Sequence, residues 1–327
     1  MKRKLTFQTE SWPIQGSFNI SRGAKTSAEV IVCEISQADH RGRGECVPYA
    51  RYGETIERVS EQINDIRDQV EAGEPQESIV DAMPPGAARN AVDCALWDLK
   101  AKSNGVPVHQ LIGLRPPRPV VTATTISLGE AGEMAHVAEK LTDYPLLKVK
   151  LGGEGDAERI RAVAAAVPNS RIILDANEAW SAGNISEFLH ESAKPNIVLI
   201  EQPLPKGEDE ILSELPRPVP ICADESAHVS SDLEMLVGRY DCINVKLDKA
   251  GGLTEAIKMC RTATELGFSL MVGCMVGTSL GMAPAILLAQ QAHFVDLDGP
   301  LILAQDREDG LVYEGAQVSP PSPKLWG

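Results

Sequence analysis

The chain has 327 residues, of which 43% are hydrophobic, and its formal net charge at pH 7 is −15. This length accommodates two domains, or one large barrel with a smaller partner domain. The acidic balance, which no basic cluster offsets, excludes general nucleic-acid binding, and no apolar run reaches the ~18 residues that a membrane span needs.

The first part of the chain predicts strands followed by helices. Alternation around Leu5 and Phe7 and the apolar run at 30–35 predict strands, with a polar loop over 16–28 between them. Apolar residues from 56 to 70 recur at intervals of three and four, which predicts a helix, and a second helix is expected over 86–103. We therefore expect an α+β domain over residues 1–118, which ends in a proline-rich stretch.

From residue 119 the pattern changes to apolar runs that alternate with helical segments. The runs start 22 to 26 residues apart and number eight, as in a (β/α)8 barrel. We expect this barrel over 119–299, with about seven helices, and a segment over 300–327 that returns to the first domain. A doubly wound open sheet is disfavoured because no Gly-rich phosphate turn follows the first strand. The expected strands are Val120–Leu128, Leu146–Leu151, Arg171–Asp175, Ile197–Glu201, Pro220–Asp224, Cys242–Lys246, Phe268–Gly273 and His293–Asp296.

Two lysines share one face of the second expected strand. Lys148 and Lys150 are two residues apart, and a strand points such residues to the same side. An exposed edge strand with solvated lysines is the alternative, because burying two like charges is costly unless anions or function compensate. The carboxylates and the further lysine at the ends of later strands decide against that alternative.

Three consecutive strands end in a carboxylate, namely Asp175, Glu201 and Asp224. In a barrel of this kind the chemistry lies at the carboxyl ends of the strands. Three carboxylates without His or Cys suit a hard cation such as Mg²⁺ or Mn²⁺. Helix N-capping could explain any one of them, but three in consecutive units predict a metal site.

The sixth strand ends in Lys246, and in a ring of eight the sixth strand lies opposite the second. Lys150 and Lys246 would therefore face each other across the mouth of the barrel. This arrangement suits removal of a proton from one face of a carbon acid and its return on the other, with the metal stabilising the enolate. The metal and the Lys148 ammonium are expected to lower the pKa of each base. Salt bridges to the neighbouring carboxylates are the structural alternative.

The eighth strand ends in Asp296 and Asp298, which share one face at the rim. A turn at the following glycine would explain them structurally, whereas a clamp for a substrate ammonium would explain them functionally. Residues 277–281 match the GxSxG pattern of serine hydrolases, but that order requires a histidine after the acid, and the last histidine is His293. A binding protein without activity is the remaining alternative, since fold does not fix function.

Together these residues resemble the enolase superfamily, in its muconate-lactonising subgroup, and within it the dipeptide epimerases that act on L-Ala-D-Glu and L-Ala-L-Glu. The resemblance extends over essentially the whole chain and includes the segments 45–49, 86–91 and 246–249. It implies an α+β capping domain over a (β/α)7β barrel and one Mg²⁺ per subunit. The implied roles are acid/base catalysis for Lys150 and Lys246; metal binding for Asp175, Glu201 and Asp224; and substrate binding for Lys148, Thr125, Cys274, Met275, Asp296, Asp298 and Arg22, with Lys25 as the alternative to Arg22.

The resemblance also implies an isomerase for small dipeptides that serves murein peptide recycling. The alternatives are an epimerase for another dipeptide class, o-succinylbenzoate synthase, N-succinylamino acid racemase or a cycloisomerase, and none of the last three needs an ammonium clamp. The seven cysteines form no CxxC pair, which favours reduced thiols in a cytoplasm. No nucleic-acid or membrane partner is expected, and a homo-oligomer is compatible with the sequence.

Overall fold

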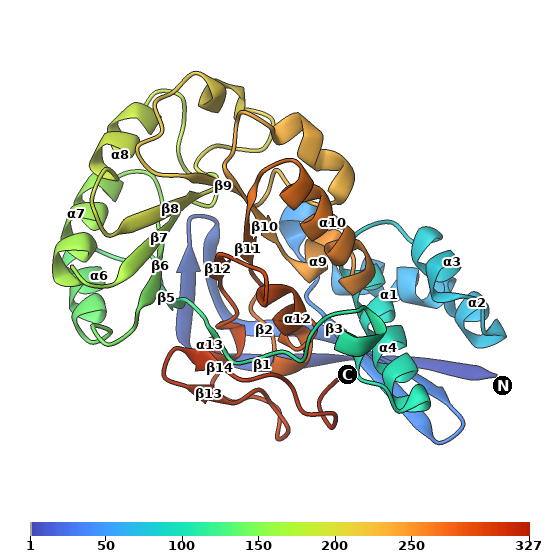
Figure 1. Cartoon of the computed structure of the whole chain (residues 1–327). Coiled ribbons are helices and arrows are strands. Elements are labelled where there is room, and N and C mark those ends of the chain that lie inside the picture. The colour runs from blue at the N-terminus through green and yellow to red at the C-terminus, as the bar shows by residue number, and fades with distance from the viewer. Residues whose placement is uncertain (1) are drawn as a thin grey trace.

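The computed structural model describes residues 2–327. A three-stranded antiparallel sheet with helices on it forms a capping domain, and an eight-stranded parallel sheet curls into a TIM-type barrel with helices outside it (Figure 1). A third, three-stranded sheet joins the end of the chain to the entrance of the barrel. The predicted fold class is confirmed.

The capping sheet consists of β1 (Arg3–Ile20), β2 (Gly23–Gln37) and β3 (His40–Cys46). β1 and β2 form one long hairpin whose pairing is interrupted between Pro13 and Phe18 and resumes up to the tip. The prediction of a loop over 16–28 was therefore wrong. This part of the hairpin extends beyond the capping core and is largely exposed, so its apolar alternation is limited to Phe18 and Ile20, which is too short to predict a strand.

Helices cover one face of the capping sheet. A Cβ at Gly42 would lie 2.1 Å from the carbonyl oxygen of Ala95 in α4 (Ala87–Asn104), so only glycine lets β3 approach this helix so closely. The helix expected over 56–70 is broken after Asp65, where Ile66 separates two shorter helices. The helical elements of this domain are η1 (Ala50–Tyr52), α1 (Ile56–Asp65), α2 (Arg67–Ala72), α3 (Gln76–Asp81), α4 (Ala87–Asn104) and α5 (Val108–Leu111).

The barrel strands follow the chain order around the curled sheet. The strand expected over 120–128 is in fact two elements, because β4 (Val120–Val121) leaves the barrel to pair with the C-terminal segment. The seam between the last and first strands is bridged by the Ala123 amide, which donates to the Val295 carbonyl at 2.7 Å. The strands are β5 (Thr124–Ile126), β6 (Leu146–Lys150), β7 (Arg171–Asp175), β8 (Ile197–Glu201), β9 (Ile221–Ala223), β10 (Cys242–Val245), β11 (Ser269–Val272) and β12 (Phe294–Val295).

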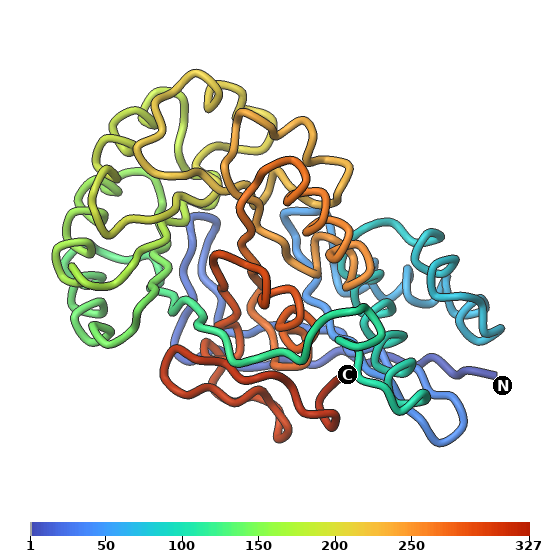
Figure 2. Tube along the Cα trace, viewed as in Figure 1, coloured from blue at the N-terminus to red at the C-terminus, as the bar shows by residue number. Residues whose placement is uncertain are grey.

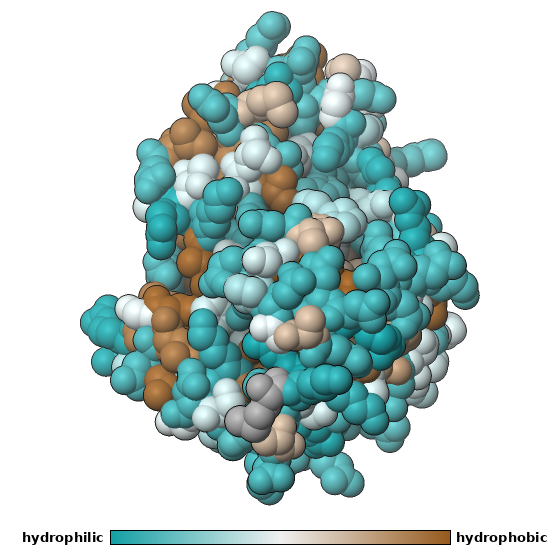
Figure 3. Space-filling view, turned by 90° about the vertical axis from the view of Figure 1, so that its right-hand side faces the viewer, coloured by the Kyte–Doolittle hydropathy of each residue, from teal (hydrophilic) through white to brown (hydrophobic). Residues whose placement is uncertain are grey.

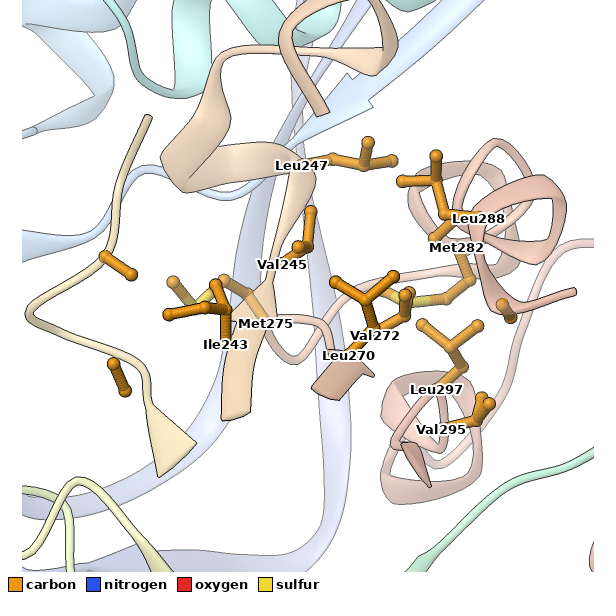
Figure 4. Close-up of a cluster of buried hydrophobic side chains, with 14 of the residues drawn as sticks. Ile243, Val245, Leu247, Leu270, Val272, Met275, Met282, Leu288, Val295 and Leu297 are labelled. Carbon is orange, nitrogen blue, oxygen red and sulfur yellow. The ribbon is translucent and has the colours of Figure 1, made fainter. Parts of the chain in front are cut away.

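The connections between the strands are helical, but those after β8 and β9 contain only 3₁₀ helices. Five prolines between 203 and 220 explain the first of these, because proline lacks the amide that continues an α-helix. Outward-facing residues of β10 and β11 pack against the helices around the barrel, as Figure 4 shows for Val272 of β11, which lies beside Met282 of the helix that follows. The connecting elements are α6 (Ala131–Glu139), α7 (Asp156–Ala166), α8 (Ile185–Glu191), η2 (Glu210–Ser213), η3 (Ser230–Leu236), α9 (Leu247–Ala250), α10 (Leu253–Glu265), α11 (Ser279–Met282) and α12 (Ala285–Ala289).

The C-terminal segment runs back along the capping domain, as the tube in Figure 2 shows. It contains α13 (Gly299–Ile302), β13 (Tyr313–Glu314) and β14 (Gln317–Val318), and β14 pairs with β4. At its end the Trp326 indole donates to the Cys94 carbonyl of α4 at 3.0 Å. The segment thus ties the barrel entrance to the main capping helix.

The surface is mostly hydrophilic on the face in Figure 3, where apolar residues form small scattered patches. Charged residues make up 24% of the chain, and acidic residues outnumber basic ones, 46 to 31. Within residues 2–327, no helix has both the length and the apolar character that crossing a membrane requires.

Candidate active site

The strand alternation of the barrel builds the site in layers. Leu146 belongs to a small apolar cluster formed by one inward residue from each strand or its entrance, which closes the bottom of the barrel. Two and four residues further along β6, Lys148 and Lys150 point the same way, and both are buried. The alternative of an exposed edge strand with solvated lysines is therefore excluded.

Lys148 lies at the centre of a group of carboxylates. Its Nζ is 2.7 Å from Asp296 Oδ2, 2.7 Å from Glu201 Oε2 and 3.0 Å from Asp175 Oδ2. Burial opposes the charge of this ammonium, but Asp175, Asp296 and Glu201 outweigh burial and hold its pKa well above the usual range. Lys148 is therefore a fixed positive charge beneath the mouth of the barrel.

Lys150 lies one layer higher, at the end of β6. Its Nζ donates to Asp175 Oδ2 at 2.6 Å and to Asn177 Oδ1 at 3.4 Å. Its ammonium lies 5.8 Å from the centre of the Phe18 ring, which the β1–β2 hairpin brings over the barrel from the capping domain. Asp175 and Asn177 thus hold the Lys150 side chain in place, and Phe18 covers its ammonium.

Lys246 follows β10, four positions from β6 in the strand order and hence on the opposite side of the barrel. Its Nζ donates to Asp224 Oδ2 at 2.7 Å and lies 3.9 Å from Glu201 Oε1. Burial opposes its charge, but Asp224 outweighs burial and raises its pKa. Lys148 lowers this pKa in the direction expected from the sequence, but its effect is smaller than that of Asp224.

The three strand-end carboxylates Asp175, Glu201 and Asp224 are fully buried side by side on β7, β8 and directly after β9. Burial and the adjacent Asp175 raise the pKa of Glu201 to about 7. Across residues 2–327, no group of three His, Cys, Asp or Glu side chains is arranged to hold a metal ion as it stands. The reason is local, because the Lys148 ammonium lies between Asp175 and Glu201.

The donor set nevertheless suits a hard cation. Glu201 Oε2 and Asp224 Oδ1 are buried and accept no hydrogen bond from any described residue, although each lies close to an ammonium. Carboxylate oxygens of this kind are the ligands that Mg²⁺ prefers. A metal ion could therefore be accepted by these carboxylates once the Lys148 ammonium moves out from between them.

The backbone that carries these carboxylates is constrained. Asn177 and Gln202, just after β7 and β8, have φ of 45° and 35°, which non-glycine residues adopt at a cost. The Gln202 side chain accepts from the Asp224 amide at 2.9 Å and donates to the Tyr240 hydroxyl at 3.0 Å. Gln202 thus fixes the end of β8 to the end of β9 and orients Asp224.

The acidic pair after β12 lies beside Lys148. Asp296 Oδ2 accepts from Lys148, while its buried Oδ1 has no hydrogen-bond partner among the described residues. Asp298 Oδ2 accepts from the Thr125 amide at 2.7 Å. Burial and the neighbouring Asp296 raise the pKa of Asp298 to about 7. The pair retains acceptor capacity that a cationic group of a ligand could satisfy.

A cavity of about 460 Å³ lies above these side chains, between the barrel mouth and the capping domain. The capping domain contributes the hairpin tip and the segment around Tyr49. The predicted site residues that line the cavity are Arg22, Lys25, Thr125, Lys148, Lys150, Asp224, Lys246, Cys274, Met275, Asp296 and Asp298. Asp175 and Glu201 lie below it, beneath the lysines.

The two candidate cations of the hairpin differ in their partners. Arg22 donates to Glu225, Asn177 and Tyr49. The Lys25 side chain has no hydrogen bond or ion pair with any described residue, and its ammonium lies 5.1 Å from the centre of the Tyr49 ring. Lys25 is therefore the cation that is available to a ligand.

Sequence reasoning missed several side chains that hold the site together. Asn244 donates to Glu201 at 2.8 Å, and Lys249 donates to the Asp224 carbonyl at 2.5 Å. Asn177 and Glu225 contact Lys150 and Arg22. The alternation along β10 points Asn244 inward with Lys246, so strand register alone could have identified it, whereas the contacts of Lys249 depend on tertiary packing.

The GxSxG motif has a structural role. The Ser279 hydroxyl donates to Asp306 and accepts from the Leu311 amide, so it ties α11 to the C-terminal segment. Neither partner is a histidine, and His293 instead accepts from the Leu270 amide. The motif therefore does not form a serine nucleophile.

Two family models match the chain. The model described as "Mandelate racemase / muconate lactonizing enzyme, N-terminal domain" matches residues 2–113, and the one described as "Enolase C-terminal domain-like" matches residues 132–322. Together they extend over the capping domain and the barrel.

Curated relatives match over nearly their whole length. An L-Ala-D/L-Glu epimerase of Escherichia coli (strain K12) is 44% identical over 94% of this chain and 97% of its own. An N-acetyl-D-glutamate racemase of Pseudoalteromonas is also 44% identical, over 91% of this chain and 95% of its own.

Solved structures agree with the sequence comparisons. An enolase family member from Agrobacterium tumefaciens with homology to dipeptide epimerases, crystallised with sodium and L-Ala-L-Glu, is 54% identical with a TM-score of 0.97, over 99% of this chain and 100% of its own. A dipeptide epimerase from Cytophaga hutchinsonii in complex with Mg and D-Ala-L-Val is 28% identical with a TM-score of 0.92, over 98% of this chain and 94% of its own.

Proposed function

The chain belongs to the mandelate racemase and muconate lactonizing enzyme group of the enolase superfamily, and on that premise we propose that it epimerises dipeptides at the α-carbon of the C-terminal residue. The observation that carries the proposal is the opposition of two buried lysines that line one cavity, Lys150 at the end of β6 and Lys246 after β10. A base on each face of a planar carbon is what inversion of its configuration requires.

In the proposed reaction one lysine accepts the α-proton and the other returns a different proton to the opposite face. Each lysine must be neutral to accept a proton and charged to donate one, so the pair alternates between the two forms. Asp175 and Asp224 each accept a hydrogen bond from one of the lysines and thereby aim its Nζ. The cavity walls and the Phe18 ring exclude water from the lysine on β6.

We propose that Asp175, Glu201 and Asp224 hold one Mg²⁺, as the buried Glu201 and Asp224 oxygens that lack hydrogen bonds favour. When bound, the ion supplies Lewis acidity for the negative charge that develops on the substrate carboxylate. Lys148, displaced from between Asp175 and Glu201, would then donate to the same substrate carboxylate.

The substrate class follows from the remaining charges of the cavity. Asp296 and Asp298 would bind the free ammonium of a dipeptide, and Lys25 would bind an acidic side chain on its C-terminal residue. L-Ala-D-Glu and L-Ala-L-Glu carry both groups, so we propose their interconversion. We prefer Lys25 to Arg22 for the side-chain carboxylate because Arg22 already has carboxylate partners. Thr125, Cys274 and Met275 would line the remainder of the substrate.

An N-acylglutamate racemase is the second candidate, because one relative with 44% identity is an N-acetyl-D-glutamate racemase. Such a substrate has the α-carboxylate and the glutamyl side chain but no ammonium. In that case Asp296 and Asp298 would have no cationic partner on the ligand. The acidic pair therefore favours the dipeptide.

The test is deuterium incorporation in D₂O, read by mass spectrometry across a library of dipeptides and N-acylated amino acids. We expect exchange at the C-terminal α-carbon, with L-Ala-L-Glu and L-Ala-D-Glu among the best substrates. If N-acetylglutamate or N-succinylamino acids exchange faster than their dipeptide counterparts, the ammonium clamp is wrong. Absence of exchange with every compound would support a binding protein without activity.

We further propose that the reaction serves murein peptide recycling in the cytoplasm. Its proposed substrate has the composition of a murein peptide fragment, and all seven cysteines are unpaired, which suits a reducing compartment. The expected division into 1–118, 119–299 and 300–327 remains our proposal for the domains. A measurement of mass in solution tests whether the protein forms a homo-oligomer.

A further inference from the structure

We propose that Arg22 is a positioning residue that fastens the tip of the β1–β2 hairpin over the barrel mouth and does not itself read the substrate. We call residues 18–25 the arm. The inference rests on the proposed dipeptide epimerase function and deepens it, because it separates what holds the arm in place from what recognises the substrate side chain.

The guanidinium of Arg22 connects the arm to two barrel strands. One terminal nitrogen, Nη1, donates to the Asn177 carbonyl after β7 at 2.9 Å. The other, Nη2, donates to Glu225 Oε1 after β9 at 2.8 Å and to the Tyr49 hydroxyl at 3.0 Å. Glu178 lies 3.3 Å from Nη1. Both ends of the guanidinium fork are thus engaged across the domain boundary.

The arm has few other polar attachments to the barrel, although Phe18 also packs against an apolar cluster with Val276 and Ile302. The two strands of the arm pair with each other and with no barrel strand, and an interruption of the ladder between Pro13 and Phe18 separates them from the rest of the hairpin. Residues 22–25 are exposed. Two further hydrogen bonds reach the barrel, from the Ser21 hydroxyl to the Asn177 carbonyl and from the Leu128 amide to the Asn19 carbonyl. Both involve neutral groups, which are weaker partners than the charged pairs of Arg22.

The arm carries groups that matter for any dipeptide. Phe18 lies over the Lys150 ammonium, and Phe18 and Ile20 line the cavity. Asn177 links the arm to the base directly, because its carbonyl accepts from Arg22 while its side chain accepts from Lys150. Release of the arm would therefore loosen the base and open the cavity irrespective of the substrate side chain.

The ion pair with Glu225 also explains why Arg22 is unsuited to binding a substrate carboxylate. Glu225 is 1% exposed, and its second oxygen already lacks a hydrogen bond from any described residue. If Arg22 turned to a ligand, it would leave a buried carboxylate without its closest cationic partner, which is strongly unfavourable. Lys25 can bind a ligand without breaking any such pair.

The test compares Arg22→Met with Lys25→Met on L-Ala-L-Glu and on its neutral isostere L-Ala-L-Gln. For Arg22→Met we expect kcat/KM to fall by roughly tenfold or more on both dipeptides, as loss of a charged hydrogen bond implies, with their ratio preserved. For Lys25→Met we expect the ratio itself to collapse, with the main loss on L-Ala-L-Glu. Arg22→Lys should recover part of the loss on both substrates. A change of the Glu/Gln ratio in Arg22→Met would overturn the proposal.

Hydrogen exchange of the arm gives a second readout that does not depend on activity. In Arg22→Met the peptide containing residues 18–25 should exchange faster, while in Lys25→Met it should not. The matched control is Arg161→Met, which removes an arginine from the outer barrel pair with Glu191 and should leave both readouts unchanged. If the arm of Arg22→Met exchanged as slowly as that of the wild type, Arg22 would not be the residue that fastens the arm. If the wild type turns over neither dipeptide, the proposed function fails, and the exchange measurement still decides on Arg22.

Discussion

Replacing each opposed lysine separately tests the geometry of the proposed reaction. Lys150→Ala and Lys246→Ala should each abolish epimerisation, because inversion needs a base on both faces. Each variant should still exchange the α-proton of one epimer, since the remaining lysine can remove and return a proton on its own side. General acid–base catalysis by a positioned side chain contributes typically ~10²–10⁴-fold, so we expect a loss of at least this size on the face that lacks its lysine.

The structure predicts that both variants fold. Lys246→Ala leaves Asp224 with Lys249, whose Nζ is 2.5 Å from Asp224 Oδ1, and Lys150→Ala leaves Asp175 with Lys148 at 3.0 Å. No buried carboxylate therefore loses all of its cationic partners. The cost should resemble that of one charged hydrogen bond, about 1–3 kcal/mol, and stay below the ~3–5 kcal/mol of a buried charge left alone. Thermal unfolding measures this cost.

The assay is deuterium incorporation into each epimer in D₂O, followed by mass spectrometry with chiral separation of the products. The two variants should show opposite preferences, one exchanging the L-epimer and the other the D-epimer. Exchange of the same epimer by both variants would show that the lysines do not act on opposite faces. The assignment of β6 and β10 to opposite sides of the substrate would then have to be abandoned.

Three further predictions concern the metal, the acidic pair and the domain contact. Chelation should abolish activity and Mg²⁺ restore it, and Mg²⁺ should raise the melting temperature of the wild type but not of Asp224→Asn. Because the pKa of Asp298 is raised to about 7, its carboxyl is protonated below that pH, so kcat/KM for dipeptides should fall as the pH drops through about 7, and Asp298→Asn should flatten that limb of the profile. Arg307→Met should destabilise the protein by about 2–4 kcal/mol in denaturant unfolding, because it removes the cationic partner of the buried Glu45, which keeps only its bonds to Thr278.

The barrel strands were predictable because burial on both faces gives them continuous apolar runs. The expected β7 and β8 agree with the structure to the residue, and the others differ mainly at their ends. The β1–β2 hairpin could not be found in this way. Its outer half is largely exposed, only Phe18 and Ile20 alternate with polar residues there, and Gly23 is the one turn signal at its tip, which is too short a pattern to predict a strand.

The side chains of the site likewise differ in whether the sequence could predict their positions. Those at strand ends, such as Lys246 and Asp175, were predicted from position alone, since register and strand order decide where they point. The ionic partners of Arg22 were not predictable, because Glu225 is 203 residues away along the chain and meets it only after two domains have packed. The same argument applies to Lys148, whose place between carboxylates depends on three other strands.

The charges of the site explain why so many ionic groups can be buried together in the barrel. Four lysines are balanced by four carboxylates, while Glu225 is paired with Arg22 and Asp298 remains for the ammonium of the substrate. A divalent cation adds two positive charges, of which the substrate α-carboxylate offsets one. One of the opposed lysines must be neutral to accept the α-proton, so the second positive charge of the metal offsets the charge that this lysine lacks. When the proton moves to the lysine, the total charge of the site does not change, and the negative charge that develops on the substrate carboxylate would be stabilised by the metal and Lys148. The balanced groups are Lys148, Lys150, Lys246 and Lys249 with Asp175, Glu201, Asp224 and Asp296.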